Sequence, residues 1–229
     1  MTFDRIAPWY RALEYLTFGR ALERRRFEYL DELSAARRVL ILGDGDGRFT
    51  ARLTAHNPDV QIDSVDLSAR MLDLARGRIG PNGRVNLLHA DARTFEPCGC
   101  YDAIVTHFFL DCLTNAETQT LLARLSEALR PGGQWIVSEF QIPDAGPMRF
   151  IARAIVSALY LAFRILTGLR VNRLPGHGAA LSAHGFRRHQ FRKAAGGLLI
   201  SELWKLNESS ASCDSCNPST DTAPDCTAS

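Results

Sequence analysis

The stretch from Arg38 to Thr50, RVLILGDGDGRFT, constrains the fold more than any other part of the chain. It begins with an apolar run, Val39–Leu42, that is typical of a parallel strand buried on both faces. Glycines and aspartates alternate over Gly43–Gly47, and a helical pattern of apolar residues starts at Phe49. This order brings backbone N–H groups and the positive end of a helix dipole to the carboxyl edge of a sheet. Nucleotides bind at this edge in α/β proteins.

The glycine spacing by itself leaves two cofactor classes open. The dinucleotide fingerprint G-x-G-x-x-G requires a glycine where this chain has Arg48. The observed G-x-G-x-G spacing resembles motif I of the class I S-adenosylmethionine-dependent methyltransferases. Asp66 ends the next predicted strand, 60–65, and a carboxylate there accepts the ribose hydroxyls of either cofactor. A third interpretation is structural, with glycines that only allow strand and helix to pack closely.

Composition predicts one globular domain without strong attraction to nucleic acid. The chain has 229 residues, 46% hydrophobic and 23% charged, which is enough for a large core, and its formal net charge is +2. No charged segment followed by an apolar one opens the sequence, so we expect a cytoplasmic protein whose cysteines are reduced thiols. Cys213 and Cys216 have the spacing of half a zinc site, but no second pair stands near them, and no metal is expected.

More specific motifs follow in the second half of the predicted sheet. A fourth strand, 101–106, runs into the sequence HFFLDCL, and an amphipathic helix, the sequence LRPGG and a strand at 134–140 come next. This combination resembles the class I methyltransferases. It implies a doubly wound α/β fold with a mostly parallel, seven-stranded sheet, helices on both faces and a terminal antiparallel hairpin. The hairpin is predicted from strands at 187–192 and 198–206.

The amino-terminal sequences FDRIAPWY and LTFG, followed by a basic helix, resemble the ubiquinone and menaquinone biosynthesis methyltransferases. The resemblance implies a helical cap at residues 1–35, with Tyr10 either a cofactor contact or an ordinary core aromatic. Arg24, Arg25 and Arg26 are expected to form a solvated turn of that helix. Arg11 stands where the family has an aspartate, so the same substrate is not implied.

The resemblance implies S-adenosylmethionine as cofactor, with S-adenosylhomocysteine as its product. Asp91 is expected near the adenine amino group, because a carboxylate accepts from that donor. Ile41 replaces the acidic residue that the family has before the first glycine, so the amino group of the methionine half is expected to contact Asp44 or Asp46. The expected cofactor residues are Tyr10, Gly43, Asp44, Gly45, Gly47, Asp66, Leu67, Met71, Asp91, Ala92 and His107.

Methyl transfer from a sulfonium needs mainly alignment of the acceptor and exclusion of water. An aromatic ring such as that of Phe108 can stabilise the cation. If the acceptor must lose a proton, His107 is the candidate base, since its ordinary pKa is near neutrality and we expect it at the mouth of the site. Asp111 is the candidate that orients His107. The alternative is that the two form a cap and its partner on a helical turn.

Residues 143–175 interrupt the predicted sheet with a helix. Its polar residues form one stripe, and apolar residues fill most of the remaining circumference; the stripe consists of Arg149, Arg153, Ser157, Tyr160 and Arg164. Its apolar stretch is too short to span a bilayer. One interpretation is that the helix packs across the domain with its arginines in water. The other is that it covers the substrate or contacts a membrane surface through 148–167, for an apolar acceptor that can also be anionic. Residues 207–229 are polar and predicted to be a disordered tail, which leaves 36–206 as the methyltransferase domain.

The sequence therefore predicts transfer of a methyl group to a small, hydrophobic acceptor of quinone-like, phenolic or lipid-like type. Two alternatives are a nicotinamide-dependent oxidoreductase and a non-catalytic subunit that binds S-adenosylmethionine. A nucleic-acid partner is not expected, because no basic stripe with interleaved aromatics lies beside the site. The expected location is the cytoplasm, with a peripheral membrane contact as the second possibility.

Overall fold

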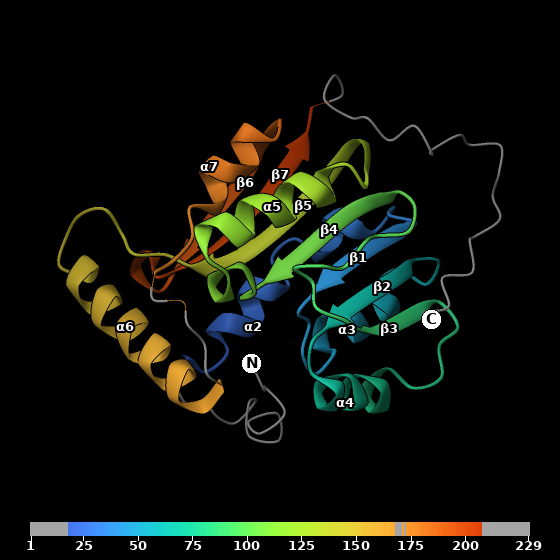
Figure 1. Cartoon of the computed structure of the whole chain (residues 1–229), viewed down its shortest axis with the longest axis horizontal. Coiled ribbons are helices and arrows are strands. Elements are labelled where there is room, and N and C mark those ends of the chain that lie inside the picture. Colours follow the sequence, from blue (N-terminus) through green and yellow to red (C-terminus); the bar gives the residue numbers. More distant parts are fainter. Residues whose placement is uncertain (1–17, 168–170, 172, 208–229) are drawn as a thin grey trace.

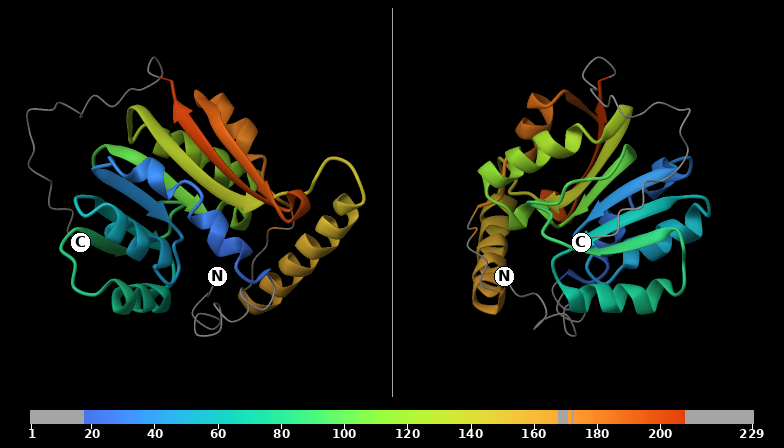
Figure 2. Two further views of the ribbon diagram at one scale, coloured as in Figure 1. Left: turned by 180° about the vertical axis from the view of Figure 1, so that it is seen from behind. Right: turned by 45° about the vertical axis from the view of Figure 1, so that its right-hand side comes forward.

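The computed structural model describes residues 18–167, 171 and 173–207. They contain a 7-stranded sheet in the order β3-β2-β1-β4-β5-β7-β6, with helices on both faces (Figures 1 and 2). The strands are β1 (Arg38–Leu42), β2 (Gln61–Asp66), β3 (Val85–His89), β4 (Tyr101–His107), β5 (Leu129–Phe140), β6 (Phe186–Ala194) and β7 (Leu199–Leu206). The helices are α2 (Ala21–Arg26), α3 (Arg48–His56), α4 (Ala69–Ile79), α5 (Asn115–Ser126), α6 (Met148–Thr167) and α7 (His177–Ala183), with 3₁₀ turns η2 (Leu30–Leu33), η3 (Leu110–Cys112) and η4 (Ala195–Gly197).

The strands from β1 to β5 run parallel, whereas β7 is antiparallel to both β5 and β6. The predicted fold class, a mostly parallel sheet that ends in an antiparallel hairpin, is therefore confirmed. The strand β5 begins earlier than the sequence predicts, at Leu129, because the chain rejoins β4 after an irregularity at the glycines of LRPGG.

Side chains of the central strands alternate between two cores, one on each face of the sheet. Leu40 and Leu42 of β1 pack in a core with α5 and α7, while Val39 and Ile41 pack in a second core with η2 and α3. All four side chains are at most 1% exposed. This double burial explains why the sequence of β1 is a continuous apolar run rather than an alternating one.

The strand order reverses at β1, whose neighbours are β2 on one side and β4 on the other. In parallel sheets such a reversal opens a crevice at the carboxyl ends of the two strands. The loops that follow β1, β2, β3 and β4 meet at this edge, and α6 lies beyond it, apart from the sheet (Figure 1). Among the described residues no helix is long and apolar enough to cross a membrane.

The amino-terminal region is helical where the structure describes it. Residues 18–33 form the short helix α2 and the 3₁₀ turn η2, and Tyr10 lies outside the described residues. Arg26 is not solvated, since only 7% of it is exposed. The hydroxyls of Ser138 and Ser201 both donate to the carbonyl oxygen of Arg25, at 2.9 and 3.0 Å. These bonds hold the end of α2 against β5 and β7 and so bury the side chain that follows.

The cysteines also differ from the expectation of reduced thiols throughout. Cys98 and Cys112 are free, but Cys100 is disulfide-bonded. The expectation rested on the assumed compartment, and compartment alone does not determine whether two thiols meet in the fold. The cysteine pair at 213 and 216 and the expected tail, apart from Asn207, lie outside the described residues.

Substitution of Gly47 tests how closely α3 packs against α4. Gly47 has a φ of +74°, and a Cβ there would lie 2.6 Å from the Cβ of Ala75 in α4. Gly132 has a similar φ of +71°, but its Cβ would meet nothing within 4 Å. We expect Gly132→Ala to lower the free energy of unfolding by about 1–2 kcal/mol from backbone strain, and Gly47→Ala to cost a further 1–3 kcal/mol, roughly, from overpacking. Urea denaturation of the two variants measures the difference, and equal losses would contradict the packing role.

Candidate active site

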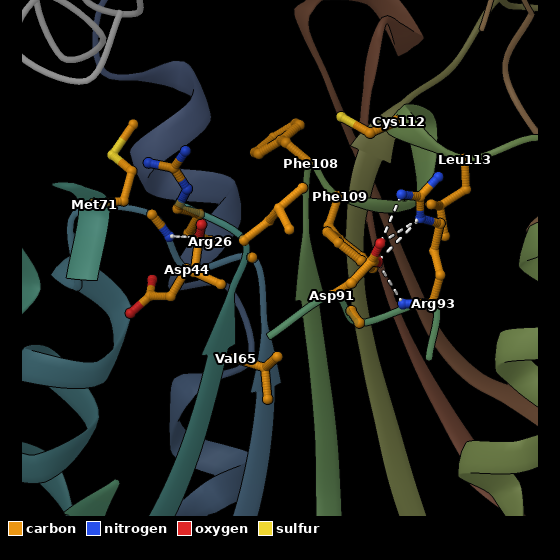
Figure 3. Close-up of a pocket in the computed structure, with 15 residues that line it drawn as sticks. Arg26, Asp44, Val65, Met71, Asp91, Arg93, Phe108, Phe109, Cys112 and Leu113 are labelled. Atoms are coloured by element: carbon orange, nitrogen blue, oxygen red, sulfur yellow. Dashed lines mark hydrogen bonds and ion pairs between the residues drawn. The ribbon is translucent and has the colours of Figure 1, made fainter. Parts of the chain in front are cut away.

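A cavity at the carboxyl edge brings together residues from the ends of four parallel strands (Figure 3). Eight of the eleven expected cofactor residues line it: Gly43, Asp44, Gly45, Asp66, Leu67, Met71, Asp91 and Ala92. The sequence analysis did not assign Arg26, Val65, Arg93, Phe109, Cys112 and Leu113, which line it as well. Its volume is about 120 Å³.

The glycine turn is shaped for close approach of a ligand. Gly43 and Gly45 have φ values of +69° and +64°, which L-residues with side chains rarely adopt. A Cβ on Gly45 would meet only the sulfur of Met71, at 3.8 Å, so a side chain at this position would occupy the cavity itself. The N–H of Gly45 donates to Oδ2 of Asp66 at 3.0 Å, and this bond fixes the Asp66 carboxylate beside the turn.

The structure separates the two aspartates of the turn. Asp46 is paired with Arg48 and Arg78, at 2.9 and 2.8 Å, and does not line the cavity. Asp44 does line it, and its carboxylate accepts from the N–H groups of Phe49 and Thr50 at the start of α3, at 3.3 and 3.0 Å. Burial raises the pKa of Asp44 to about 6, against the opposing effect of these hydrogen bonds. Of the two candidates, Asp44 is thus the one available to an ammonium group.

Asp91 lies in the wall of the cavity, but its carboxylate already has a partner. The Nη2 atom of Arg93 lies 2.6 Å from Oδ2, and the backbone N–H of Arg93 donates to Oδ1 at 2.9 Å (Figure 3). The hydrogen bonds from Arg93 hold the pKa of Asp91 below its usual value. Arg93 also contacts Glu117 of α5, at 3.1 Å. An adenine amino group could contact Asp91 only through a carboxylate lone pair that does not accept from Arg93. The expected contact stays a prediction.

His107 and Gly47 do not line the cavity, which corrects their expected positions. His107 continues the alternation of β4, so its ring points to the same face as Ala103 and Val105 and packs edge-on against Phe49, with ring centroids 4.6 Å apart. Neither ring nitrogen has a partner among the residues that the structure describes. Burial, aided by the charge of Arg26, lowers the pKa of His107 well below its usual value. His107 is therefore a neutral core side chain and not a group at the mouth of the site.

Asp111 does not orient His107, since no hydrogen bond joins the two residues. It belongs to η3, and burial raises its pKa to about 6. A different acid, Glu139 of β5, organises this turn: its Oε1 atom accepts from the N–H groups of Phe109 and Leu110, at 3.1 and 2.8 Å. Glu139 is 1% exposed, and burial raises its pKa well above the usual value. An acidic residue inside the apolar strand sequence WIVSEF was the signal that sequence reasoning missed.

Phe108 marks the point where the chain leaves β4. Its φ of +53° is unusual for a residue with a side chain and turns its ring over the carboxyl edge. The ring lies 5.2 Å from that of Phe140, centroid to centroid, and the guanidinium of Arg26 lies 5.6 Å from its centroid. An aromatic ring and a buried arginine therefore both line the cavity (Figure 3).

Comparisons with known proteins identify the family of the chain. Residues 39–133 match the model of a family described as a methyltransferase domain. The ubiquinone/menaquinone biosynthesis C-methyltransferase UbiE of Syntrophotalea carbinolica is 31% identical over 217 residues, which cover 86% of this chain and 89% of the relative. The chain belongs to the class I S-adenosylmethionine-dependent methyltransferases. It is an enzyme of that class rather than a nicotinamide-dependent oxidoreductase.

Other relatives and solved structures agree with this assignment. A trans-aconitate 2-methyltransferase of Methylobacterium radiotolerans is 35% identical over 157 residues, covering 67% of this chain and 57% of the relative. Human N-acetylserotonin methyltransferase, solved with S-adenosylmethionine, has a TM-score of 0.63 at 18% identity and covers 88% of this chain and 55% of its own. The methyltransferase NodS of Bradyrhizobium japonicum, with S-adenosylhomocysteine, has a TM-score of 0.59 at 17% identity, covering 81% and 88%.

The residues of this methyltransferase fit the cofactor of its class. The Asp66 carboxylate beside a glycine turn suits ribose hydroxyls, and the space above Gly45 would be lost to any side chain there. When bound, S-adenosylmethionine supplies an activated methyl group. We propose that the chain's own part is to hold the nucleoside at Asp66, to pair the ammonium with Asp44, and to exclude water with Phe108 and Phe109.

The role of Asp44 predicts a pH-dependent affinity. With a pKa of about 6, Asp44 is ionised above that pH, where we propose that it pairs with the ammonium group, and it becomes neutral as the pH falls through 6. We expect the affinity for S-adenosylhomocysteine to fall about tenfold from pH ~7.5 to pH ~5. Asp44→Asn should bind more weakly at neutral pH and lose this dependence. Calorimetric titration measures both, with Asp73→Asn, an exposed position on α4, as the control. A variant that keeps the full pH dependence would contradict the role.

Proposed function

We propose that the methyltransferase acts on a small, apolar acceptor of quinone-like, phenolic or lipid-like type. The observation that carries the proposal is the aromatic surface of Phe108 and Phe140, whose ring centroids are 5.2 Å apart next to the cofactor cavity. Phe18 extends it, with its ring 5.3 Å from that of Phe140. A flat, apolar acceptor packs on such a surface with its reacting atom near the methyl group. The similarity to a quinone-biosynthesis C-methyltransferase supports the same class of acceptor.

The structure offers no base at the expected position, because His107 is buried against Phe49. The proposed reaction therefore does not use His107 as a base, either alone or oriented by Asp111. An acceptor that is already anionic or readily ionised needs no base from the protein.

Methyl transfer to candidate acceptors tests this function. The assay follows labelled methyl groups from S-adenosylmethionine to a prenylated naphthoquinol, a prenylated phenol and a fatty acid, with trans-aconitate as a polar comparison. We expect turnover of at least one apolar acceptor and none of trans-aconitate. Asp66→Ala should reduce turnover by a factor of about 100 or more, since it removes charge-assisted hydrogen bonds to the ribose. Asp73→Ala, which changes an exposed acid of α4, should have no effect.

We further propose that α6 contacts an anionic membrane surface. Ala152 and Val156 of α6 are buried against the domain, whereas Phe150 and Ile165 are 71% and 73% exposed. Ile151 and Leu161 are about half exposed and share this outer face at helical spacing. An apolar outer face beside a stripe of arginines is the pattern of a helix that lies in a membrane interface. Such a contact would bring the enzyme to apolar acceptors dissolved in the bilayer.

Vesicle flotation tests the membrane contact. We expect the protein to float with vesicles that contain phosphatidylglycerol and to bind neutral phosphatidylcholine vesicles more weakly. Replacing Phe150, Leu161 and Ile165 with serine should weaken binding by about tenfold or more, because each buried CH₂ contributes about 0.8 kcal/mol. Leu74→Ser is the control, since Leu74 is 41% exposed on α4. Equal flotation of the triple variant and the parent would refute the contact.

A further inference from the structure

A second and larger cavity lies between α6, α7 and the strands β5, β6 and β7. Its volume is about 740 Å³, within the range of sites that hold small molecules. Its apolar lining comes from several elements: Phe140, Ile142, Val156, Leu174 and Ile200. None of the catalytic or cofactor residues predicted from the sequence lines it, as far as the structure describes them. The cavity therefore needs an explanation of its own.

The polar stripe of α6 faces this cavity in its middle part. Arg153, Ser157 and Tyr160 all line it, while Phe150, Leu161 and Ile165 point to the outer face of the helix. The helix thus has three sides, with Ala152 and Val156 toward the core. Three of the five members of the stripe thus adjoin one space, and two of these, Arg153 and Ser157, are also exposed to water.

The side chains that line the cavity carry more positive than negative charge. Glu202 of β7 is 2% exposed, and its carboxylate accepts from His177, Arg188 and Trp204, at 2.9, 2.9 and 3.1 Å. The side-chain hydrogen bond from His177 and its neighbours lower the pKa of Glu202 despite its burial, so its negative charge is satisfied within this group. Two further arginines, Arg153 and Arg173, line the cavity, and neither forms an ion pair with any residue that the structure describes. The cavity is therefore positive.

The cavity is a direct neighbour of the cofactor site. The hydroxyl of Tyr160, in its wall, donates to the backbone oxygen of Asp111 at 3.1 Å, and the next residue, Cys112, lines the cofactor cavity. The ring of Phe140, also in its wall, packs on Phe108 of the cofactor cavity. The turn η3 and this pair of rings are thus a common wall, close to where the methyl group must be presented.

We propose that this cavity is the acceptor site and that it selects an apolar molecule with one anionic group, which Arg153 and Arg173 bind. The proposal rests on the proposed function and narrows its acceptor class. Two arginines suit a carboxylate, sulfonate or phosphate, because guanidinium groups form charge-assisted hydrogen bonds with such oxygens. The apolar lining accommodates the body of the molecule, and its end nearest η3 lies next to the methyl donor.

A matched pair of probes tests the charge selectivity. Biphenyl-4-carboxylate and its neutral counterpart biphenyl-4-carboxamide are titrated by calorimetry into protein saturated with S-adenosylhomocysteine. We expect the carboxylate to bind at least ten times more tightly. The double variant Arg153→Gln/Arg173→Gln should lose this preference, while Arg164→Gln, on the same stripe but outside the cavity lining, should keep it within twofold. Equal binding of the two probes to the parent protein, or an equal loss in Arg164→Gln, would overturn the proposal.

A second pair of variants tests the location without changing charge. Ser157→Trp adds bulk to the cavity and should weaken both probes tenfold or more, whereas Ala154→Trp, on the exposed side of α6, should leave them unchanged. If Ser157→Trp binds both probes like the parent, they bind elsewhere and the proposal fails. Unchanged affinity for S-adenosylhomocysteine shows that each variant is folded.

Competition separates an acceptor site from a site for another ligand. We expect the carboxylate probe to inhibit methyl transfer to the acceptor of the transfer assay, competitively with that acceptor. Binding of the probe without inhibition would refute the assignment as acceptor site. Failure of the proposed function is a different result: it appears as no methyl transfer to any apolar acceptor, while the probe titrations still decide whether the cavity selects anions.

Discussion

The reversal of strand order at β1 is the constraint on which the rest of the structure depends. The strands β2 and β4 flank β1 and run parallel to it, so the chain must leave the sheet at the same edge after each of them. Because both faces of these strands pack in cores, the ends of the strands are where their groups can reach a ligand. The glycine turn at Gly43, the carboxylate of Asp66 and the ring of Phe108 meet there for this single reason.

Polar residues inside otherwise apolar strands then position the elements around this edge. Ser138 and Ser201 are paired across β5 and β7, and both bind the carbonyl oxygen of Arg25. Glu139, next to Ser138, points to the other face and holds the backbone of η3. Buried polar groups are costly unless their hydrogen bonds are made, so these contacts occur only in one arrangement of α2 and η3. That arrangement brings Arg26 and Phe108 to the site.

The helix α6 connects this edge to the proposed surroundings of the acceptor. One of its sides packs on the domain, a second lines the large cavity with Arg153 and Tyr160, and the third exposes Phe150 and Ile165. These three sides suggest three proposed roles. The methyl donor binds at the ends of β1 and β2, the acceptor is recognised under α6, and an apolar acceptor reaches the site along the outer face of α6. The first part rests on the family, and the other two are the proposals made above.

Local pattern was sufficient to predict most of the fold and the donor half of the site. The run Val39–Leu42, the glycine turn and Asp66 interact mainly with neighbours in sequence or with strands whose order the fold class dictates, so the prediction of a seven-stranded sheet was correct. Eight expected residues line one cavity because each directly follows a parallel strand or begins the helix after it. These features are properties of strand, turn and helix periods, which sequence displays directly.

Tertiary contacts decided what the sequence left open. The direction of the His107 ring depends on where β4 ends, one residue later than predicted, and that single step turns it from the mouth of the site into the core. The sequence alone predicts that Arg26 is solvated like its two neighbouring arginines. In the structure it is buried, because Ser138 and Ser201, more than a hundred residues away, donate to the carbonyl oxygen of Arg25. The cavity between α6 and β7 likewise involves residues far apart in sequence. The sequence by itself determined the helices and strands and the edge of the sheet at which the cofactor site lies. Only the packed structure decided which side chains face each other at that edge, because burial and hydrogen-bond partners are set by distant segments.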